Sequence, residues 1–499
     1  MFMQRFLRAL VAFCCLFALL VSSAAAVTLA DKVSESTLAN GLKVLLVNRP
    51  GSPTVAAYIT IGVGSVHETS ANRGVAHLLE HMLFKGTKTL GTTDYAAEKP
   101  LLDEIADVGG RIDALKFRPD RQAEVAKLRA RLASLQQQHK QYVVKDEFSS
   151  IYAANGGVGY NAFTSKDLTT YLISLPSNKL ELWALIESDR MKNAVLREFY
   201  TERDVIQEER RRSYESSPQG LLYENLLASA FMVHPYRAPT IGWHSDIASL
   251  TLAETDEFHR RYYAPINTVI TLVGDFDQHQ ALELIERYFG DIPAGTPVPL
   301  VTAQEPPQDG ERRAFVEFDA EPALAIAWHK PTLPAREDYV FDLLDLVLTG
   351  GRTSRLYQAL VVEQQLATSV GSYGAPGARY ANLFVISASP RHPHTAAELE
   401  RAIYAELQRL MNEPVSDAEL HQALNRLRTD RLRGMQSNGG LARTLSYYQT
   451  VVGDWRYLTG YDAVVSTITS DEITQLVRNY LTSENRTVIT LGRGGEVKP

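Results

Sequence analysis

The chain combines short apolar runs with longer stretches in which apolar residues recur at helical spacing. The β-branched runs predict strands over Val55–Val63, Leu168–Leu175 and Thr268–Gly274. The helical spacing predicts helices over Ala71–Lys85, Lys179–Met191 and Phe199–Tyr214. Because strands and helices come in groups rather than in strict alternation, the pattern indicates an α+β fold built in layers, not a doubly wound parallel sheet.

A segment rich in Pro and Gly divides the chain into two halves of similar length. It spans residues 293–312 and includes Pro297, Pro299, Pro306 and Pro307. It is the predicted linker between an N-terminal unit, residues 27–292, and a C-terminal unit, residues 313–499. The pentapeptide Thr-Val-Ile-Thr-Leu at residues 268–272 recurs at residues 487–491. The repeat predicts an internal duplication, although β-branched strands can also resemble one another by chance.

Residues 99–144 depart from this layered pattern. Apolar residues keep heptad spacing on both sides of a break near Arg118-Pro119, namely Leu101, Ile105, Val108, Ile112 and Leu115 before it and Val125, Leu128, Leu132 and Leu135 after it. The second stretch is charged on its other faces. The pattern favours a helical hairpin that protrudes from the first unit, and the alternative is a pair of ordinary helices packed in its core.

The N-terminus has the order of a secretory signal. Arg5 and Arg8 precede an apolar run from Leu10 to Val21, and small residues follow up to Ala26. This predicts a signal peptide over residues 1–26 and an exported protein, whereas an apolar run of about 12 residues is too short for a membrane anchor. The only cysteines, Cys14 and Cys15, fall inside this segment. Any metal in the mature chain must therefore bind to His, Asp or Glu.

Charge and hydropathy exclude several classes of partner. The chain of 499 residues has 51 Lys and Arg against 58 Asp and Glu, a net charge of −7. The longest basic cluster is Arg210-Arg211-Arg212, which follows acidic residues and is typical of a solvated helix face. We therefore expect no nucleic-acid partner. No later stretch is apolar enough to predict a membrane span.

The clearest chemical signal is His77-Leu78-Leu79-Glu80-His81, which lies in a predicted helix. Residues three and four positions apart share a helix face, so His77, Glu80 and His81 converge. Two neutral imidazoles at this spacing bind one Zn²⁺, and a carboxylate beside them acts on the water that the metal activates. The order His-x-x-Glu-His is the inverzincin pattern. The alternative is a helix with two surface histidines.

A catalytic zinc site needs a third protein ligand. The predicted helix that contains Glu202, Glu208 and Glu209 offers carboxylates. Glu202 and Glu209 are seven residues apart on one face, so one could bind metal while the other orients a histidine ligand. The local spacing does not choose between Glu208 and Glu209. An acidic helix of this kind is also typical of a solvated surface.

Together these residues resemble the insulinase/pitrilysin family of zinc metallopeptidases, in its half-length branch that is similar to the mitochondrial processing peptidase. The resemblance rests on the segments His77–His81, Asn161–Ser165 and Glu202–Glu209 and extends over essentially the whole mature chain. It implies two duplicated α/β-roll layers per chain, with the helical hairpin as an insertion in the first. Two such chains would enclose peptides in a clam-shaped chamber.

The resemblance also implies roles for the residues of the motif. It makes His77, His81 and Glu209 the ligands of one zinc ion per chain and Glu80 the general base. Glu202 takes the place of the acid that orients a histidine ligand. The implied function is a zinc-dependent endopeptidase that cleaves peptides or small unfolded proteins by means of metal-activated water. The family also leads us to expect a periplasmic location, with secretion into the medium as the alternative.

Asn161, Ala162 and Phe163 correspond to an edge strand that pairs with the substrate backbone. The alternative for these three residues is an ordinary buried strand. The resemblance fails at two other positions, where family members place an Arg and a Tyr that complete the active site and this chain has Val361 and Thr368. A related zinc-less subunit is therefore the expected partner and the source of the Arg and Tyr, with Arg352 or Tyr373 of this chain as substitutes in a homodimer.

Two functions from other classes remain open at the level of the sequence. The first is a structural or assembly subunit that keeps the fold without proteolysis. The complete set of ligands together with Glu80 argues against it, because an active site that is no longer catalytic tends to lose these residues. The second is a secreted zinc-binding protein, which would need a fourth ligand to close the metal site, and no candidate lies nearby in the sequence.

Overall fold

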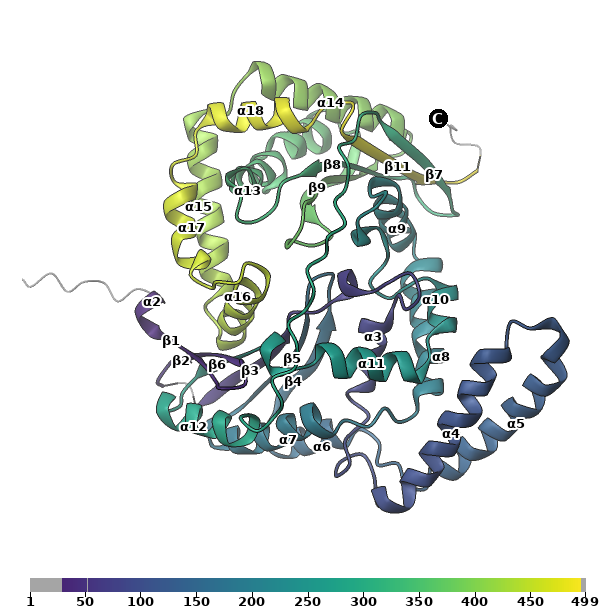
Figure 1. Ribbon diagram of the computed structural model, residues 1–499. Helices are drawn as coiled ribbons and strands as arrows, with labels where there is room; N and C mark the ends of the chain where they lie inside the picture. Colours follow the sequence, from purple (N-terminus) through teal and green to yellow (C-terminus); the bar gives the residue numbers. More distant parts are fainter. Residues whose placement is uncertain (1–28, 52, 495–499) are drawn as a thin grey trace, which may run out of the picture.

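The computed structural model describes residues 29–51 and 53–494, so the predicted signal peptide lies outside the described residues. Two sheets, each covered by helices, form the two halves of the molecule, and an extended segment after residue 289 joins them (Figure 1). Each half has its own apolar core. The predicted α+β fold is confirmed. Within the described residues, no helix has the length and hydrophobicity needed to cross a bilayer.

The first sheet has six strands in the order β1-β2-β6-β3-β5-β4. The strands are β1 (Val33–Thr37), β2 (Lys43–Asn48), β3 (Thr54–Ile61), β4 (Val158–Thr164), β5 (Thr169–Pro176) and β6 (Thr268–Gly274). β6 runs parallel to β2, and the pairs β3/β6, β3/β5 and β4/β5 are antiparallel. β4 is thus an edge strand, and no other described strand pairs with its outer side.

Helices of the first half cover one face of this sheet. They are α3 (Val75–Met82), α6 (Glu147–Ala154), α7 (Leu180–Asn193), α8 (Phe199–Arg210), α10 (His244–Ser249), α11 (Leu252–Tyr262) and α12 (Gln278–Phe289), and the short helix α2 (Leu29–Lys32) precedes β1. Alternate strand residues such as Ile59 and Ile61 enter this core, whereas Tyr58 points to the opposite face. The predicted strands therefore agree with the structure to within two residues.

Two of the predicted α-helices are shorter than expected. α3 begins only at Val75 because Gly74, at its N-cap, has a φ of 89°, a left-handed value that prevents the helix from extending back to Ala71. α8 is α-helical up to Arg210 and continues as a π-helix over Arg211–Glu215. Apolar spacing does not detect such changes because it records which face is buried, not how the backbone bonds.

The second sheet has five strands in the order β7-β11-β8-β10-β9. They are β7 (Arg312–Glu317), β8 (Ala323–Lys330), β9 (Ala367–Ala375), β10 (Asn382–Pro390) and β11 (Arg486–Gly492). The helices that follow them are α13 (Arg336–Thr349), α14 (Ala396–Asn412), α15 (Asp417–Gly434), α17 (Tyr457–Val465) and α18 (Ser470–Tyr480). The order and the directions of pairing repeat those of β2-β6-β3-β5-β4. This repeat confirms the internal duplication.

The repeated pentapeptide lies in equivalent strands, β6 and β11, but with opposite orientation. In β6, Ile270 and Leu272 face the helices of the first half. In β11, the matching residues Ile489 and Leu491 face away from the helices of the second half and contact another core. A shift of one residue reverses the faces of a strand. The duplication therefore rests on the topology, and the identity of the two pentapeptides reflects their similar burial.

The two halves exchange a helix, which the sequence analysis did not predict. α9 (Pro218–Ala230) belongs to the first half, but its Leu226 and Leu227 pack against the second sheet. α16 (Asn438–Val451) belongs to the second half, but its Leu441 and Leu445 pack against the first sheet. Both faces of each sheet carry apolar side chains, and the exchanged helix covers the face that the half's own helices leave free.

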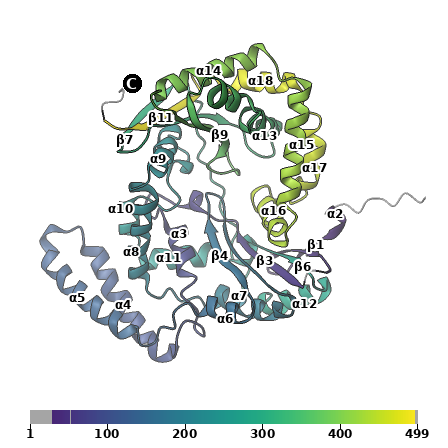
Figure 2. The same ribbon diagram turned by 180° about the vertical axis from the view of Figure 1, so that it is seen from behind.

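The predicted hairpin is formed by α4 (Tyr95–Leu115) and α5 (Gln122–His139), which project from the first half away from both sheets (Figure 2). The break predicted near Arg118-Pro119 is a 3₁₀ turn over Pro119–Arg121. A buried ionic network anchors the base of the hairpin: Glu98 of α4 accepts hydrogen bonds from His139 Nε2 (2.7 Å) and Arg197 Nε (2.7 Å). The hairpin is thus fixed to the first half at its base.

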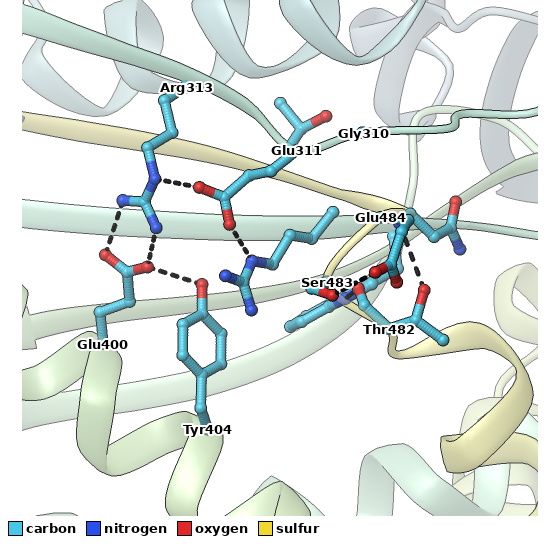
Figure 3. A network of polar contacts seen from close by, with 12 residues as sticks. Gly310, Glu311, Arg313, Glu400, Tyr404, Thr482, Ser483 and Glu484 are labelled. Atoms are coloured by element: carbon cyan, nitrogen blue, oxygen red, sulfur yellow. Dashed lines mark hydrogen bonds and ion pairs between the residues drawn. The ribbon is translucent and has the colours of Figure 1, made fainter.

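The segment between the halves ends in a polar network at the start of the second sheet. Residues 293–311 form no helix or strand. Arg313 of β7 forms a bidentate ion pair with Glu400 of α14, which also accepts a hydrogen bond from the Tyr404 hydroxyl (2.7 Å; Figure 3). Glu311 bonds both Arg313 and Arg486 of β11. These contacts fix the end of the segment to the second half.

Candidate metal centre

The buried face of α3 determines where its polar side chains point. Leu78 and Leu79 are completely buried in the first core. The opposite side of the helix presents His77 and His81, whose rings lie edge to face with centroids 4.8 Å apart. Glu80 lies between them in the sequence and is also largely buried. The helix thus holds two imidazoles and one carboxylate close together, as the spacing predicted.

The N-terminus of α3 is fixed by Glu68, a residue that the sequence analysis missed. Its carboxylate accepts the backbone N–H groups of Gly74 and Ala76, both at 2.9 Å. Gly74 has no side chain to cap the helix, and a Cβ at this position would lie 2.6 Å from the carbonyl oxygen of Ile241. Glu68 therefore satisfies helix N–H groups that an N-cap side chain would ordinarily bind.

Glu209 of α8 completes a group of three potential metal ligands. Its carboxylate oxygens lie 3.8 Å from His77 Nε2 and 3.5 Å from His81 Nε2. One ligand atom from each residue lies within 4.8 Å of the other two. Ligands of a tetrahedral zinc ion, at about 2.0–2.2 Å from the metal, are roughly 3.4 Å from one another. The spacing and the set of two imidazoles and one carboxylate therefore fit zinc.

The neighbouring Glu208 points away from the histidines. It forms a bidentate pair with the exposed Arg211, at 2.6 and 2.8 Å. Adjacent residues on a helix are rotated by about 100°, so only one of the two glutamates can face α3. The geometry favours Glu209 as the ligand and leaves Glu208 at the surface.

Glu202 holds His81 in place. His81 Nδ1 lies 2.9 Å from Glu202 Oε1, and Lys85 Nζ donates to the other oxygen at 2.5 Å. Burial opposes ionisation of Glu202, but the hydrogen bonds from His81 and Lys85 outweigh it and lower the pKa of Glu202. For His81, burial opposes protonation, yet the bond to Glu202 and the surrounding carboxylates raise its pKa. A proton on Nδ1 leaves Nε2 as the atom that can bind metal.

Glu80 lies in a less polar environment than Glu202. Burial raises the pKa of Glu80 above its usual value, although Thr164 at the end of β4 donates a hydrogen bond to Oε2 at 2.5 Å. Burial, together with the charge of His81, lowers the pKa of His77 to about 3, so His77 is neutral at physiological pH. A neutral imidazole can bind a metal, and a carboxylate with a raised pKa can exchange a proton near neutral pH.

Two family sequence models together match most of the chain. The model of insulinase (peptidase family M16) matches residues 43–123 and 125–243, which include every residue of the candidate centre. The model described as the peptidase M16 inactive domain matches residues 249–427. The chain belongs to the insulinase family. This membership confirms the resemblance noted in the sequence and makes the chain a relative of zinc metallopeptidases.

Relatives of this insulinase-family chain cover it almost completely. The zinc protease PqqE of Helicobacter pylori is 27% identical over 92% of this chain and 93% of its own. The uncharacterised zinc protease YmxG of Bacillus subtilis is 22% identical over 91% of this chain and 96% of its own. The crystal structure of a protease from Helicobacter pylori has a TM-score of 0.78 at 26% identity, over 92% of this chain and 99% of that one.

The periplasmic protease PqqL of Escherichia coli shares the fold in a longer chain. Its structure has a TM-score of 0.69 at 17% identity. The similarity covers 92% of this insulinase-family chain but 47% of PqqL. One such chain therefore corresponds to about half the length of PqqL.

The three residues expected to bind substrate lie in the edge strand β4, next to Thr164. Asn161 is exposed and Phe163 half-buried on the face of the sheet that contacts α16, whereas Ala162 is buried on the face that contacts α3. The strand is irregular near its start, between Val158 and Asn161. In this insulinase-family chain, the unpaired edge of β4 is therefore adjacent to Glu80, through Thr164.

Val361 and Thr368, which the resemblance aligns with an Arg and a Tyr of the family, lie in the second half. Val361 is part of a π-helix over Tyr357–Glu363 and packs against the second core. Thr368 is exposed on β9 and donates a hydrogen bond to the carbonyl of Ser389 at 3.2 Å. Neither side chain supplies a cation or a phenol.

Thr164 and Lys85, like Glu68, contact the candidate centre but were not identified from the sequence. Thr164 lies within the segment Asn161–Ser165, but its contact with Glu80 joins residues far apart in the sequence and cannot be detected from local spacing. Lys85 lies four residues after His81, one turn further along the helix direction. That spacing could have indicated its proximity to the acids that face His81.

Proposed function

We propose that this chain is a zinc-dependent endopeptidase that cleaves peptides or small unfolded proteins. The observation that carries the proposal is the group of His77, His81 and Glu209, with Glu80 on the same helix as the two histidines. The zinc proteases among its relatives support the same reading. His77, His81 and Glu209 would hold one zinc ion, and Glu202 would keep His81 oriented.

The chemistry assigns distinct tasks to the residues of the site. Bound zinc supplies a Lewis acid that makes water nucleophilic near neutral pH. Glu80 acts as the general base: its carboxylate accepts a proton from the attacking water and then donates it to the nitrogen of the departing fragment. The hydrogen bond from Thr164 fixes Oε2 and leaves Oε1 of Glu80 to carry this proton. Burial raises the pKa of Glu80, which makes its carboxylate a stronger base toward the attacking water.

The substrate would bind as an additional strand along β4. Backbone groups of Asn161, Ala162 and Phe163 would pair with it, as in other cases of β-augmentation. Such pairing requires an extended segment of about the length of the strand, and two chains closing around it would form a chamber. These requirements favour peptides and unfolded segments over folded domains.

We infer that the chain is the catalytic subunit of a dimer. Hydrogen-bond donors to the oxyanion of the attacked carbonyl typically contribute about 10²–10³ in rate, and Val361 and Thr368 cannot supply them. A homologous zinc-less subunit would contribute the Arg and Tyr. In a homodimer, Arg352 or Tyr373 of a second copy would have to take over the role. The length of PqqL, of which this chain covers 47%, supports the pairing of two such units.

We also propose that the mature chain is exported to the periplasm. The proposal rests on the order of charged, apolar and small residues in positions 1–26. Cell fractionation followed by determination of the N-terminal residue tests it. A mature chain that begins at residue 27 in the periplasmic fraction is the expected result, and an unprocessed cytoplasmic chain would contradict it.

Cleavage of a quenched fluorescent peptide library by residues 27–499, with zinc and with any homologue that co-purifies, tests the function. We expect Glu80→Gln to bind zinc and lose turnover. Glu209→Gln should lose zinc as well, whereas Glu208→Gln is the matched control because its side chain pairs with Arg211 at the surface. Equal zinc content in the two Gln variants at 208 and 209 would refute the ligand assignment.

The same assay tests whether the chain needs a homologous subunit for turnover. Full turnover by the single chain would refute a borrowed Arg and Tyr, and turnover only with the homologue would support a heterodimer. Zinc binding without turnover under every condition would instead favour the non-proteolytic structural subunit.

A further inference from the structure

Arg443 of the exchanged helix α16 lies next to the edge strand β4, although the two are about 280 residues apart in the sequence. Its guanidinium lies over the ring of Phe163, with the Cζ atom 5.3 Å from the ring centroid. The charge of Arg443 also reaches the phenol of Tyr58 on β3. The exchange of helices thus brings a cation from the second half to the strand along which we propose that substrate binds.

The charge of Arg443 is not neutralised within the described part of the chain. The side chain is exposed and forms no ion pair or hydrogen bond with another described residue. Arg379, near the same end of the sheet, differs because it donates hydrogen bonds to the carbonyl oxygens of Gly62 and Thr450. Arg379 therefore joins the two halves, whereas the donors of Arg443 have no acceptor within the described part of the chain.

The register of the sheet specifies which substrate side chain would meet Arg443. Phe163 pairs with Thr170, which pairs with Thr60, and all three lie on the face of α16. A strand added to β4 would lie about 4.8 Å away, with its side chains alternating between the two faces. The residue opposite Phe163 would therefore point toward Arg443. Its neighbour, opposite Thr164, would point toward Glu80.

We propose that Arg443 determines specificity by binding an acidic side chain of the substrate, within about two residues of the cleaved bond. The inference rests on the proposed function and adds to it a substrate class, acidic peptides. A guanidinium that lies over an aromatic ring is attracted to the ring face and keeps its N–H donors available to a carboxylate. Glutamate or aspartate opposite Phe163 would form a charge-assisted hydrogen bond that Gln or Asn cannot match.

The test uses a neutral peptide that the protein cleaves, in which single residues around the cleaved bond are replaced by Glu or by Gln. The measured quantity is the ratio of kcat/KM for Glu to that for Gln at each position, in the assembly that is active. We expect one position at which the ratio reaches roughly five- to fiftyfold, the range of a partly desolvated charge-assisted bond. Arg443→Gln should reduce this ratio to about one, and Arg443→Glu should favour Lys at the same position.

Arg433→Gln is the matched control because Arg433 is also exposed, on α15, and has no ion pair with a described residue. It should leave the ratio unchanged. A ratio near one at every position, or a preference that survives Arg443→Gln, would overturn the proposal while the proposed function stands.

Binding measurements separate this proposal from the failure of catalysis. The Glu80→Gln variant should bind fluorescently labelled Glu peptides more tightly than Gln peptides, and the additional change Arg443→Gln should remove the difference. If no peptide is cleaved by the unaltered protein, the proposed function fails. In that case equal binding of the two peptides would also reject the role of Arg443, whereas a difference that depends on Arg443 would retain it as a binding residue.

Discussion

Replacement of Glu68 by Ala tests how the metal-binding helix is held. Glu68 accepts two backbone N–H groups at the start of α3, and Gly74 cannot replace it as a cap. Removal of the carboxylate leaves two buried donors without an acceptor, each at a cost of about 1–3 kcal/mol. We therefore expect Glu68→Ala to lower the free energy of unfolding by about 2–6 kcal/mol. Burial raises the pKa of Glu68 to about 8, so its side chain is largely uncharged at neutral pH. Glu68→Gln keeps this shape and one acceptor oxygen, and it should therefore change the free energy of unfolding much less than Glu68→Ala does.

Denaturant unfolding and zinc competition measure the two consequences. Because Ala76 directly precedes His77, loosening of this turn should also weaken zinc binding. Glu257→Ala on the exposed surface of α11 serves as the control and should change stability by no more than about 0.5 kcal/mol. The reasoning is refuted if Glu68→Ala unfolds at the same denaturant concentration as this control and retains its zinc affinity.

Three further substitutions test other parts of the structure. Glu202→Gln should weaken zinc binding about 10–100-fold in chelator competition, because His81 loses its charged partner; unchanged affinity would contradict this. Burial raises the pKa of Asp342 to about 7, so its stabilising contribution is present below about pH 4 and is lost as the pH rises through 7. As the pH rises from 5 to 8, the free energy of unfolding of Asp342→Asn should therefore increase by about 3 kcal/mol relative to that of the unaltered protein. Parallel pH profiles of the two proteins would contradict this prediction. Leu445→Ala, in the completely buried face of α16, should cost about 2–5 kcal/mol in denaturant unfolding, whereas a loss under 1 kcal/mol would indicate that α16 does not stabilise the first sheet.

Features that depend on local periodicity could be predicted from the sequence. The spacing of His77, Glu80 and His81 placed them on one helix face, and the seven-residue interval placed Glu202 and Glu209 on one face of another. Both statements follow from the 3.6-residue period of the helix. The hairpin and the layered fold could be predicted for the same reason, since apolar positions record which face is buried.

Features that depend on contacts between distant segments could not be predicted. Local spacing left the choice between Glu208 and Glu209 open, and only the family resemblance indicated Glu209, because the choice depends on the direction from which α3 approaches α8. The exchange of α9 and α16 required knowledge of both sheet faces, and an amphipathic helix does not specify which sheet it covers. Glu68 caps α3 from six residues before Gly74, outside the usual capping interval.

The second half contains a pair of residues that corresponds to Glu80 and Thr164, but it lacks the two histidine ligands. In α13, Asp342-Leu343-Leu344-Asp345-Leu346 corresponds to His77-Leu78-Leu79-Glu80-His81 in α3. The correspondence holds in space, because Ser372 of β9 donates a hydrogen bond to Asp345 at 2.5 Å, as Thr164 of β4 does to Glu80. The acid and its hydroxyl donor are thus kept, while Asp and Leu replace the two imidazoles.

This replacement accounts physically for the match to the inactive domain of the family. The second half lacks the two imidazole nitrogens of an inverzincin site, because Asp342 stands at the position of His77 and Leu346, which has no ligand atom, at the position of His81. Its helix α16 nevertheless covers the first sheet and brings Arg443 to β4. The second half therefore contributes to the site through the surface it presents to the first sheet, so the two halves should lose their function when separated, even though each has its own core.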